Sequence, residues 1–304
     1  MDLKSEAGRE SFLRLADQAD VLIEAFRPGV MDRLGVGYDV LAARNPALVY
    51  CALSGFGAQG PEAMSAGHDL NYLAAAGVMD RNGVPPRAFD PPVTDVSGAL
   101  FATIAMLGAL RRREQDGVGC SIDLALADTP MLLQQFAVAA WGALGTVPRT
   151  DETYLNGGAA YYRTYATRDG RYVALGAVEP KFWQAFCTTA DHHEWIERQH
   201  EPLPQTALTA DLDRFFATLT TAQCEQRFAA ADCCFSVVLD LGEALRSAHH
   251  TSRELLRKGP QEELQALFPA WVDGIAPATR RPARTIANPV FETRHNTTKD
   301  IASH

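Results

Sequence analysis

Asp20-Val21-Leu22-Ile23-Glu24-Ala25 is a short, largely apolar stretch that predicts a buried β-strand. Working outward from it, a helical pattern at residues 38–44 leads to a second apolar run at 48–53. Strands that alternate with helices indicate a parallel sheet with crossover helices. We therefore expect an α/β fold whose ligand crevice lies beyond the carboxyl ends of these strands, where residues 26–27 and 54–57 fall.

The flanking segments extend this pattern. Residues 5–19 are amphipathic and predict a helix before the first strand, and residues 121–123 predict a third strand. The apolar residues 124–143 predict one long helix after it. No internal repeat is present in the sequence.

A second domain is predicted after a polar linker at residues 145–159. Residues 161–167 and 171–177 are two β-rich runs around Asp169-Gly170, which predicts a hairpin. Further elements are expected beyond it. They are helices at 181–189, 212–219 and 222–230, a strand at 236–240, and a helix capped by Asp240 and Glu243.

Composition limits the class of protein. The 304 residues are 47% hydrophobic and carry a formal net charge of −9 with a pI near 5.4, which argues against a general nucleic-acid or membrane-surface binder. The six cysteines show neither a Cys-x-x-Cys pair nor metal-ligand spacing, so we expect reduced thiols and no metal. No apolar run approaches the length of a membrane span and no signal pattern opens the chain, which predicts a cytoplasmic protein.

Two ionisable side chains stand at the starts of predicted helices. Gly67 breaks a loop, and His68 then falls in the first turn of an apolar run that Gly77 stops. Asp95 precedes a longer helical pattern that ends in three arginines at 111–113. An Asp before a helix is more often a cap than a catalyst, and a lone His is equally uninformative. The pair alone does not decide the function.

Several ordered blocks resemble the family III CoA-transferase superfamily of CaiB/BaiF type. The blocks are residues 19–30 (ADVLIEAFRPGV), 33–35 (RLG), 45–50 (NPALVY) and 54–57 (SGFG). Three more resemble its α-methylacyl-CoA racemase branch in particular. These are 67–72 (GHDLNY), 156–165 (NGGAAYYRTY) and 176–182 (GAVEPKF).

The resemblance implies an incomplete Rossmann-like large domain with a parallel sheet, followed by a smaller α+β domain. We expect a large CoA-binding domain at 1–144, the small domain at 160–276, and a segment at 277–304 that returns to the large domain. Members of the family open with a strand-helix portion before the segment matching Asp2-Leu3-Lys4, and we expect this chain to lack it. They form interlocked homodimers, which we expect here as well.

The resemblance also implies catalytic residues. His68 and Asp95 match the two proton-transfer groups of the racemase branch, and Glu179 matches a carboxylate that hydrogen-bonds to that His. Inverting the α-carbon of a thioester requires proton removal on one face and proton delivery on the other, so two groups are needed. Backbone N–H groups near Gly67, His68 and Val96 are expected to stabilise the enolate oxygen.

The resemblance also implies residues that bind the CoA moiety. Arginine suits the phosphates because its planar fork pairs with their oxygens. The expected binding residues are Ala25, Phe26, Arg27, Arg33, Gly67, Asp69, Leu70, Asn71 and Tyr72. No cofactor beyond the CoA of an acyl-CoA thioester substrate is expected.

Two alternatives remain open. In the CoA-transferase branch the aspartate at the position of Asp95 is a nucleophile, which forms an acyl anhydride and then an aspartyl-CoA thioester. That branch lacks the His and typically carries a Gly-rich loop, where this chain has residues 156–160, so racemisation is favoured. The other alternative is an inactive remnant that partners a full-length paralogue. The acyl chain of the substrate is left undetermined.

Overall fold

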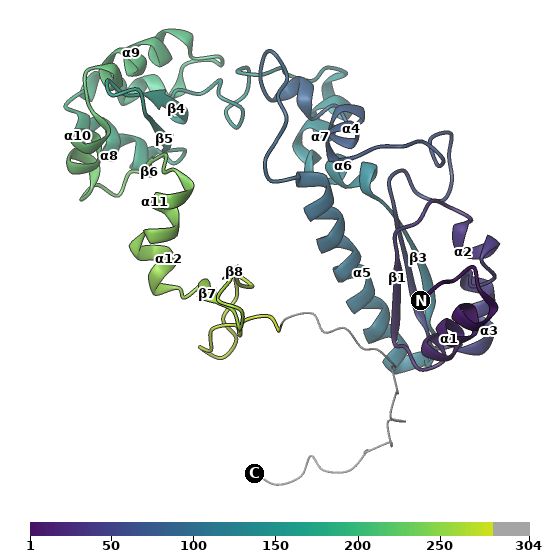
Figure 1. Cartoon of the computed structure of the whole chain (residues 1–304). Coiled ribbons are helices and arrows are strands. Elements are labelled where there is room, and N and C mark those ends of the chain that lie inside the picture. The colour runs from purple at the N-terminus through teal and green to yellow at the C-terminus, as the bar shows by residue number, and fades with distance from the viewer. Residues whose placement is uncertain (282–304) are drawn as a thin grey trace. The chain divides into compact units, whose positions relative to one another are not determined.

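The computed structural model describes residues 1–281 (Figure 1). The chain divides into two compact units, Met1–Val237 and a second unit that begins at Val238, and each is described by itself. The predicted segment at 277–304 lies largely outside the described residues. The predicted domain boundaries at 144, 160 and 276 stay predictions.

The first unit contains a three-stranded parallel sheet. Its strands are β1 (Val21–Glu24), β2 (Val49–Ser54) and β3 (Cys120–Ala125), in the order β1-β2-β3. In the register, Val21 of β1 pairs with Val49 of β2, which pairs with Cys120 of β3. The predicted α/β fold with a parallel sheet is thus confirmed, and the carboxyl ends of all three strands meet at one edge.

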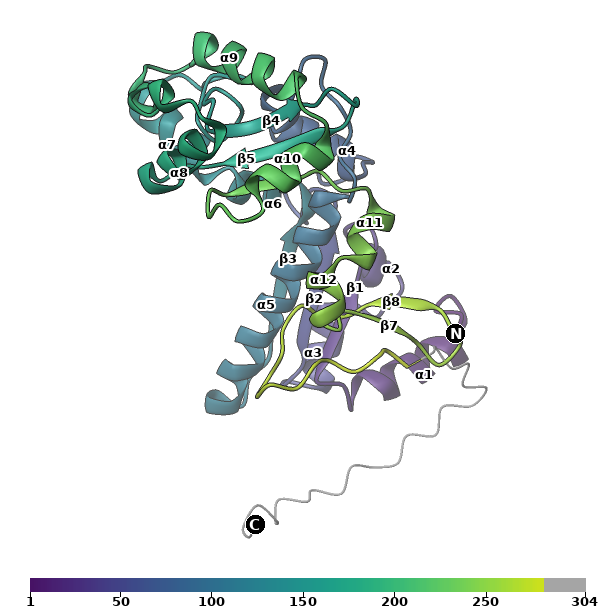
Figure 2. The ribbon, with the colours of Figure 1, turned by 90° about the vertical axis from the view of Figure 1, so that its left-hand side faces the viewer.

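Helices cover both faces of this sheet. The central strand β2 is buried on both sides, because Tyr50 packs with Leu41 and Leu48 in one core, whereas Val49 and Cys51 pack in another. The first core also contains residues of α1 (Glu6–Ala16), α2 (Val30–Arg33) and α3 (Tyr38–Arg44). The second contains Ala102 and Met106 of α5 (Val93–Asp116), which runs beside the sheet (Figure 2). Burial on two faces explains why β2 is a continuous apolar run.

The predicted single helix at 124–143 is wrong. Strand β3 continues to Ala125, a 3-10 turn follows at Leu126–Asp128, and two short helices come next, α6 (Thr129–Leu133) and α7 (Gln135–Leu144). Pro130 lies in the first turn of α6, where the missing N–H costs nothing, and it would interrupt a helix that began at residue 124. The helix α4 (Asp69–Ala75) and a 3-10 turn at Met79–Arg81 precede α5.

The expectation about membrane spans was also too strong. By length and composition alone, α5 is long and apolar enough to cross a membrane. In the structure its Ser97, Gly98 and Ala102 are buried, while Ile104 on another face is 64% exposed. Leu100 and Leu107 are exposed as well. We refer to Leu100, Ile104 and Leu107 as the α5 stripe.

The later part of the first unit contains an antiparallel sheet. The predicted hairpin is confirmed by β4 (Tyr162–Ala166) and β5 (Tyr172–Gly176), and β6 (Phe235–Val237) pairs with β5. Aromatic side chains fill the core beside it, with Phe186 stacked 5.2 Å from Phe228. The helices here are α8 (Pro180–Ala190), α9 (Thr206–Ala217) and α10 (Thr221–Phe228), with 3-10 turns at His193–Trp195 and Glu197–His200.

The second unit is small. It contains α11 (Leu241–Arg246), α12 (Ala248–Ser252) and a hairpin of β7 (Leu256–Lys258) and β8 (Leu264–Ala266). The predicted cap of α11 is confirmed, because the Asp240 carboxylate accepts the Glu243 N–H at 2.8 Å and Glu243 accepts the Asp240 N–H at 2.9 Å.

We predict that Leu41→Ala lowers the free energy of unfolding by about 2–5 kcal/mol, because it leaves a cavity in the core on one side of the sheet. Leu41 is fully buried, whereas its neighbour Val40 is 43% exposed on the same helix. The matched control Val40→Ala should therefore change stability by less than about 1 kcal/mol. Urea unfolding followed by circular dichroism measures both, and equal losses would contradict this packing.

Candidate active site

A cavity of about 540 Å³ lies at the carboxyl ends of the parallel strands. The predicted residues that line it are Ala25, Phe26, Arg27, Gly67, His68, Asn71, Tyr72 and Asp95. The remaining lining residues include Pro28, Leu53, Ser54, Gly55, Ala63, Ser65, Ala66 and Leu126. Two predicted proton-transfer groups and an arginine from β1's end are thus brought together, as expected for an open parallel sheet.

His68 is the residue that immediately precedes α4, not a residue of its first turn. Its backbone N–H donates to Asn71 Oδ1 at 3.1 Å, and the Tyr72 hydroxyl donates to the Gly67 carbonyl at 2.6 Å. The Tyr72 ring lies so close that a Cβ at Gly67 would be 2.7 Å from its Cε1, and a Cβ at Gly55 would be 2.5 Å from its hydroxyl. The backbone before His68 is therefore held against a buried aromatic ring.

Asp95 is the third residue of α5 and not the residue before it, so the helix begins earlier than predicted. The residue before the helix is Pro92, whose side chain has no oxygen to accept the first N–H groups. Instead, Asp69 Oδ1 accepts the N–H of Thr94 at 2.5 Å and that of Asp95 at 3.3 Å. Asp95 and Tyr72 line the same cavity, and burial, followed by the Asp95 charge, raises the pKa of the Tyr72 phenol.

A network at the end of β1 supports the segment that carries Phe26 and Arg27. Glu24 Oε2 accepts the Phe26 N–H at 2.7 Å, and the Tyr50 hydroxyl donates to Glu24 Oε1 at 3.1 Å. Burial, followed by the Glu24 charge, raises the pKa of Tyr50, so this phenol stays protonated and keeps donating. Phe26 and Arg27 are exposed at the cavity wall.

Four predicted site residues do not line the cavity. Glu179 is exposed at the residue before α8, and Leu70 is exposed on α4. Arg33 lies on α2 with its guanidinium beside Gly29, and Asp69 faces the start of α5. The structure therefore separates Arg27, at the cavity, from Arg33, outside it.

The predicted oxyanion donors need a correction as well. The His68 N–H is used by Asn71, and the Val96 N–H donates to the Pro92 carbonyl at 3.1 Å. Both groups are occupied within the fold, so neither is free to donate to a thioester oxygen in this arrangement. The proposed donor at Gly67 stays a prediction.

Sequence reasoning missed Leu126 because it placed this residue inside a helix. Leu126 follows the carboxyl end of β3 and lines the cavity, and its side chain lies where a Cβ at Gly98 would stand. Its position directly after a strand was the signal that could have found it. Ser54, at the end of β2, also lines the cavity, and its buried hydroxyl has no hydrogen-bond partner among residues 1–281.

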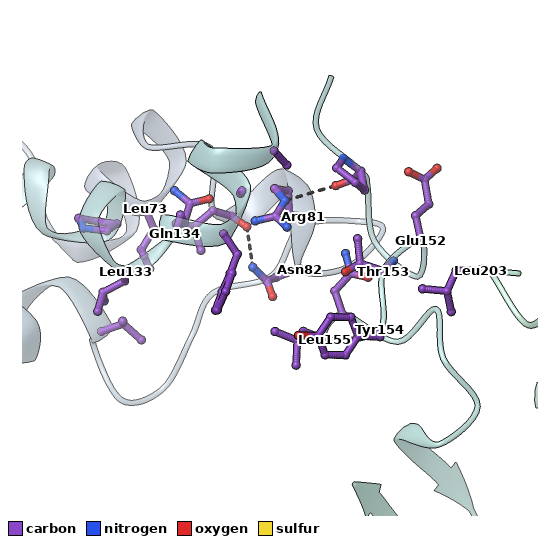
Figure 3. A pocket seen from close by; sticks show the side chains of 18 residues that line it. Leu73, Arg81, Asn82, Leu133, Gln134, Glu152, Thr153, Tyr154, Leu155 and Leu203 are labelled. Atoms are coloured by element: carbon purple, nitrogen blue, oxygen red, sulfur yellow. Dashed lines mark hydrogen bonds between the residues drawn. The ribbon is translucent and has the colours of Figure 1, made fainter. Parts of the chain in front are cut away.

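A second cavity, of about 520 Å³, contains none of the predicted site residues (Figure 3). Its lining is mainly apolar and includes Leu73 of α4 and Leu133 of α6. Arg81 Nε donates to the Pro148 carbonyl at 3.3 Å there, and Asn82 Nδ2 donates to the Val78 carbonyl at 2.7 Å. The side chains of Arg81 and Asn82 thus already donate hydrogen bonds to backbone carbonyls of the protein.

Comparisons with known proteins agree with this fold. The alpha-methylacyl-CoA racemase of Mus musculus is 35% identical over 268 residues, which are 83% of this chain and 68% of that protein. The acetyl-CoA:oxalate CoA-transferase of Acetobacter aceti is 30% identical over 271 residues, 85% of this chain and 68% of that protein. The crystal structure of a CaiB/BaiF family protein from Brucella suis superposes with a TM-score of 0.78 at 26% identity, covering 93% of this chain and 77% of that one.

The sequence profile of CoA-transferase family III matches residues 1–286. Both racemases and CoA-transferases are among the relatives, so the match defines the superfamily and not the reaction. The resemblance seen in the sequence blocks is confirmed: this chain belongs to CoA-transferase family III.

Proposed function

We propose that this protein is an acyl-CoA isomerase that racemises the α-carbon of a 2-methylacyl-CoA thioester. The observation that carries the proposal is the shared cavity lined by both His68 and Asp95. A racemase needs a base and a conjugate acid on opposite faces of one carbon, and an imidazole and a carboxylate provide such a pair. The similarity to the mouse racemase supports the same reaction.

In this mechanism one group removes the α-proton and the other returns a proton to the opposite face of the enolate. Which of the two acts as base depends on the enantiomer that binds. Asp95 lies in the first turn of a 24-residue helix, at the positive end of the helix dipole. Glu179 is proposed to orient the imidazole of His68. It does not line the cavity that contains His68 and Asp95.

The CoA moiety is proposed to bind along the wall formed by Ala25, Phe26 and Arg27. These residues follow β1 and line the cavity. The Arg27 guanidinium is exposed and can pair with phosphate oxygens. Asn71 and Tyr72 of α4 line the same cavity.

A CoA-transferase is the second candidate. The similarity to the Acetobacter transferase and the exposure of Asp95 at the cavity favour it. In that reaction the Asp95 carboxylate attacks the thioester carbonyl and releases CoA thiolate, which leaves an acyl anhydride. The thiolate then attacks the aspartyl carbonyl, releasing the acyl group as a carboxylate and leaving an aspartyl-CoA thioester for transfer.

We also propose a homodimer in which a second copy covers the α5 stripe. Three large aliphatic side chains of this stripe are more than half exposed, at 57%, 64% and 61% for Leu100, Ile104 and Leu107. Covering such a surface with apolar atoms is favourable.

The reaction is tested by supplying each enantiomer of a 2-methylacyl-CoA separately in heavy water. An isomerase incorporates deuterium at the α-carbon and interconverts the enantiomers. We expect His68→Ala and Asp95→Asn each to lower racemisation by about 10² to 10⁴, the usual contribution of a general acid or base. Both variants should retain the circular dichroism spectrum and the unfolding midpoint of the wild type.

Other outcomes of these assays would support the alternative functions or exclude a residue from the mechanism. Transfer of labelled CoA to a free carboxylate such as oxalate, without α-proton exchange, would identify the transferase. The absence of both activities would favour the inactive remnant. Normal racemisation by Asp95→Asn or His68→Ala would remove that residue from the mechanism.

The two arginines give a matched test of CoA binding. Arg27→Ala is expected to raise KM for the acyl-CoA by about 10-fold, as the loss of one charge-assisted contact predicts, with a smaller change in kcat. Arg33→Ala should leave KM within about twofold, because Arg33 lies outside the cavity. Steady-state kinetics measure both, and an equal rise in KM would contradict the assignment of Arg27 alone.

The dimer is tested by sedimentation. Ile104→Glu places a charge in the α5 stripe and is expected to convert a dimer into a monomer, because burying an unpaired carboxylate is unfavourable. The control is Val84→Glu, a change at a valine that is 89% exposed in a loop. A wild-type monomer, or a dimer that survives Ile104→Glu, would contradict the proposal.

A further inference from the structure

Asp69 joins the two elements that carry the proton-transfer groups. It is the first residue of α4 and directly follows His68. Its Oδ1 accepts the N–H of Thr94 at 2.5 Å and the N–H of Asp95 at 3.3 Å, across 25 and 26 residues of sequence. One carboxylate oxygen therefore connects the backbone beside His68 to the backbone of Asp95 itself.

The start of α5 depends on this contact. The preceding residue, Pro92, makes no side-chain cap, and Thr94 is fully buried. Water is therefore a poor substitute for the acceptor, and a buried N–H without a partner is costly. A carboxylate is the strongest available acceptor at the positive end of a long helix. Asp69 of α4 thus provides the capping acceptor that Pro92, the residue before α5, cannot provide.

We propose that Asp69 is a positioning residue that sets the separation and orientation of His68 and Asp95. This role rests on the proposed isomerase function, because only a two-group reaction requires both side chains to face one carbon. Asp69 does not line the cavity, so it acts through the backbone of its two neighbours and not on the substrate. A CoA-binding role for Asp69, which the family resemblance suggested, is replaced by this one.

A second hydrogen bond anchors Gly67, the residue that precedes His68. The Tyr72 hydroxyl donates to the Gly67 carbonyl at 2.6 Å, so the residues on both sides of His68 are anchored. The Gly67 anchor is local, within five residues, whereas the Asp69 anchor reaches the second helix. Loss of Asp69 should thus leave α4 formed while the Asp95 carboxylate shifts relative to the imidazole.

The experiment compares Asp69→Ala, Asp69→Asn and the wild-type protein with each enantiomer of a 2-methylacyl-CoA in heavy water. The readout is the ratio of racemisation to α-proton exchange, together with kcat and KM. A single group that removes and returns the proton can still exchange it, whereas racemisation needs both groups in register. Hydrogen exchange of the Thr94 and Asp95 amides reports the contact itself, independently of activity.

We expect Asp69→Ala to lower kcat for racemisation by about 100-fold with KM within about threefold, as a misplacement of about 1 Å can cost. Its racemisation-to-exchange ratio should fall, and its Thr94 and Asp95 amides should exchange faster. Asp69→Asn keeps an acceptor oxygen, so it should recover most of the rate. Asp240→Ala removes a capping aspartate of α11 and should change stability without changing the ratio.

The proposal is overturned if Asp69→Ala keeps the wild-type ratio and kcat and loses only thermal stability, since Asp69 would then be a simple helix cap. Unchanged amide exchange at Thr94 and Asp95 would overturn it as well. Failure of the proposed function is distinguishable, because the wild-type protein itself would then neither racemise nor exchange. In that case the exchange rates of the Thr94 and Asp95 amides in Asp69→Ala still decide whether Asp69 holds the start of α5.

Discussion

The structure depends on one constraint, which is that β2 must be covered on both of its faces. Val49 and Cys51 pack toward α5, whereas Leu48 and Tyr50 pack with α1, α2 and α3. In this sheet β2 runs parallel to both of its neighbours, and the crossover segments return every strand in the same direction. The carboxyl ends then meet at one edge, and the cavity with His68 and Asp95 lies there.

Much of this edge was predictable from the sequence. The apolar runs around Ile23 and Cys51 identified two strands, and the rule for parallel sheets placed Phe26 and Ser54 near the ligand. The start of α5 was not predictable in the same way. Pro92 carries no capping side chain, and the partner that replaces it, Asp69, is distant in sequence. Local patterns contain no information about such a contact.

The roles of individual residues were also predicted only in part. Family resemblance selected His68, Asp95 and Arg27, which the structure places at one cavity, but it also selected Arg33 and Leu70, which lie outside it. A motif groups residues by their order in the chain, whereas a helix directs neighbouring side chains to different sides. In the motif at 67–72, Asn71 and Tyr72 therefore line the cavity while Asp69 turns toward α5. The structure therefore distinguishes the motif residues that line the cavity from those that do not.

The close contact of Tyr72 with Gly55 and Gly67 has a consequence for evolution. Neither glycine has room for a Cβ while the ring occupies its present place. A substitution at one of the three positions would therefore be tolerated only if another changed with it, for example a smaller residue at 72 before an alanine at 67. Divergence at this corner of the molecule would therefore have to proceed through compensated pairs of substitutions.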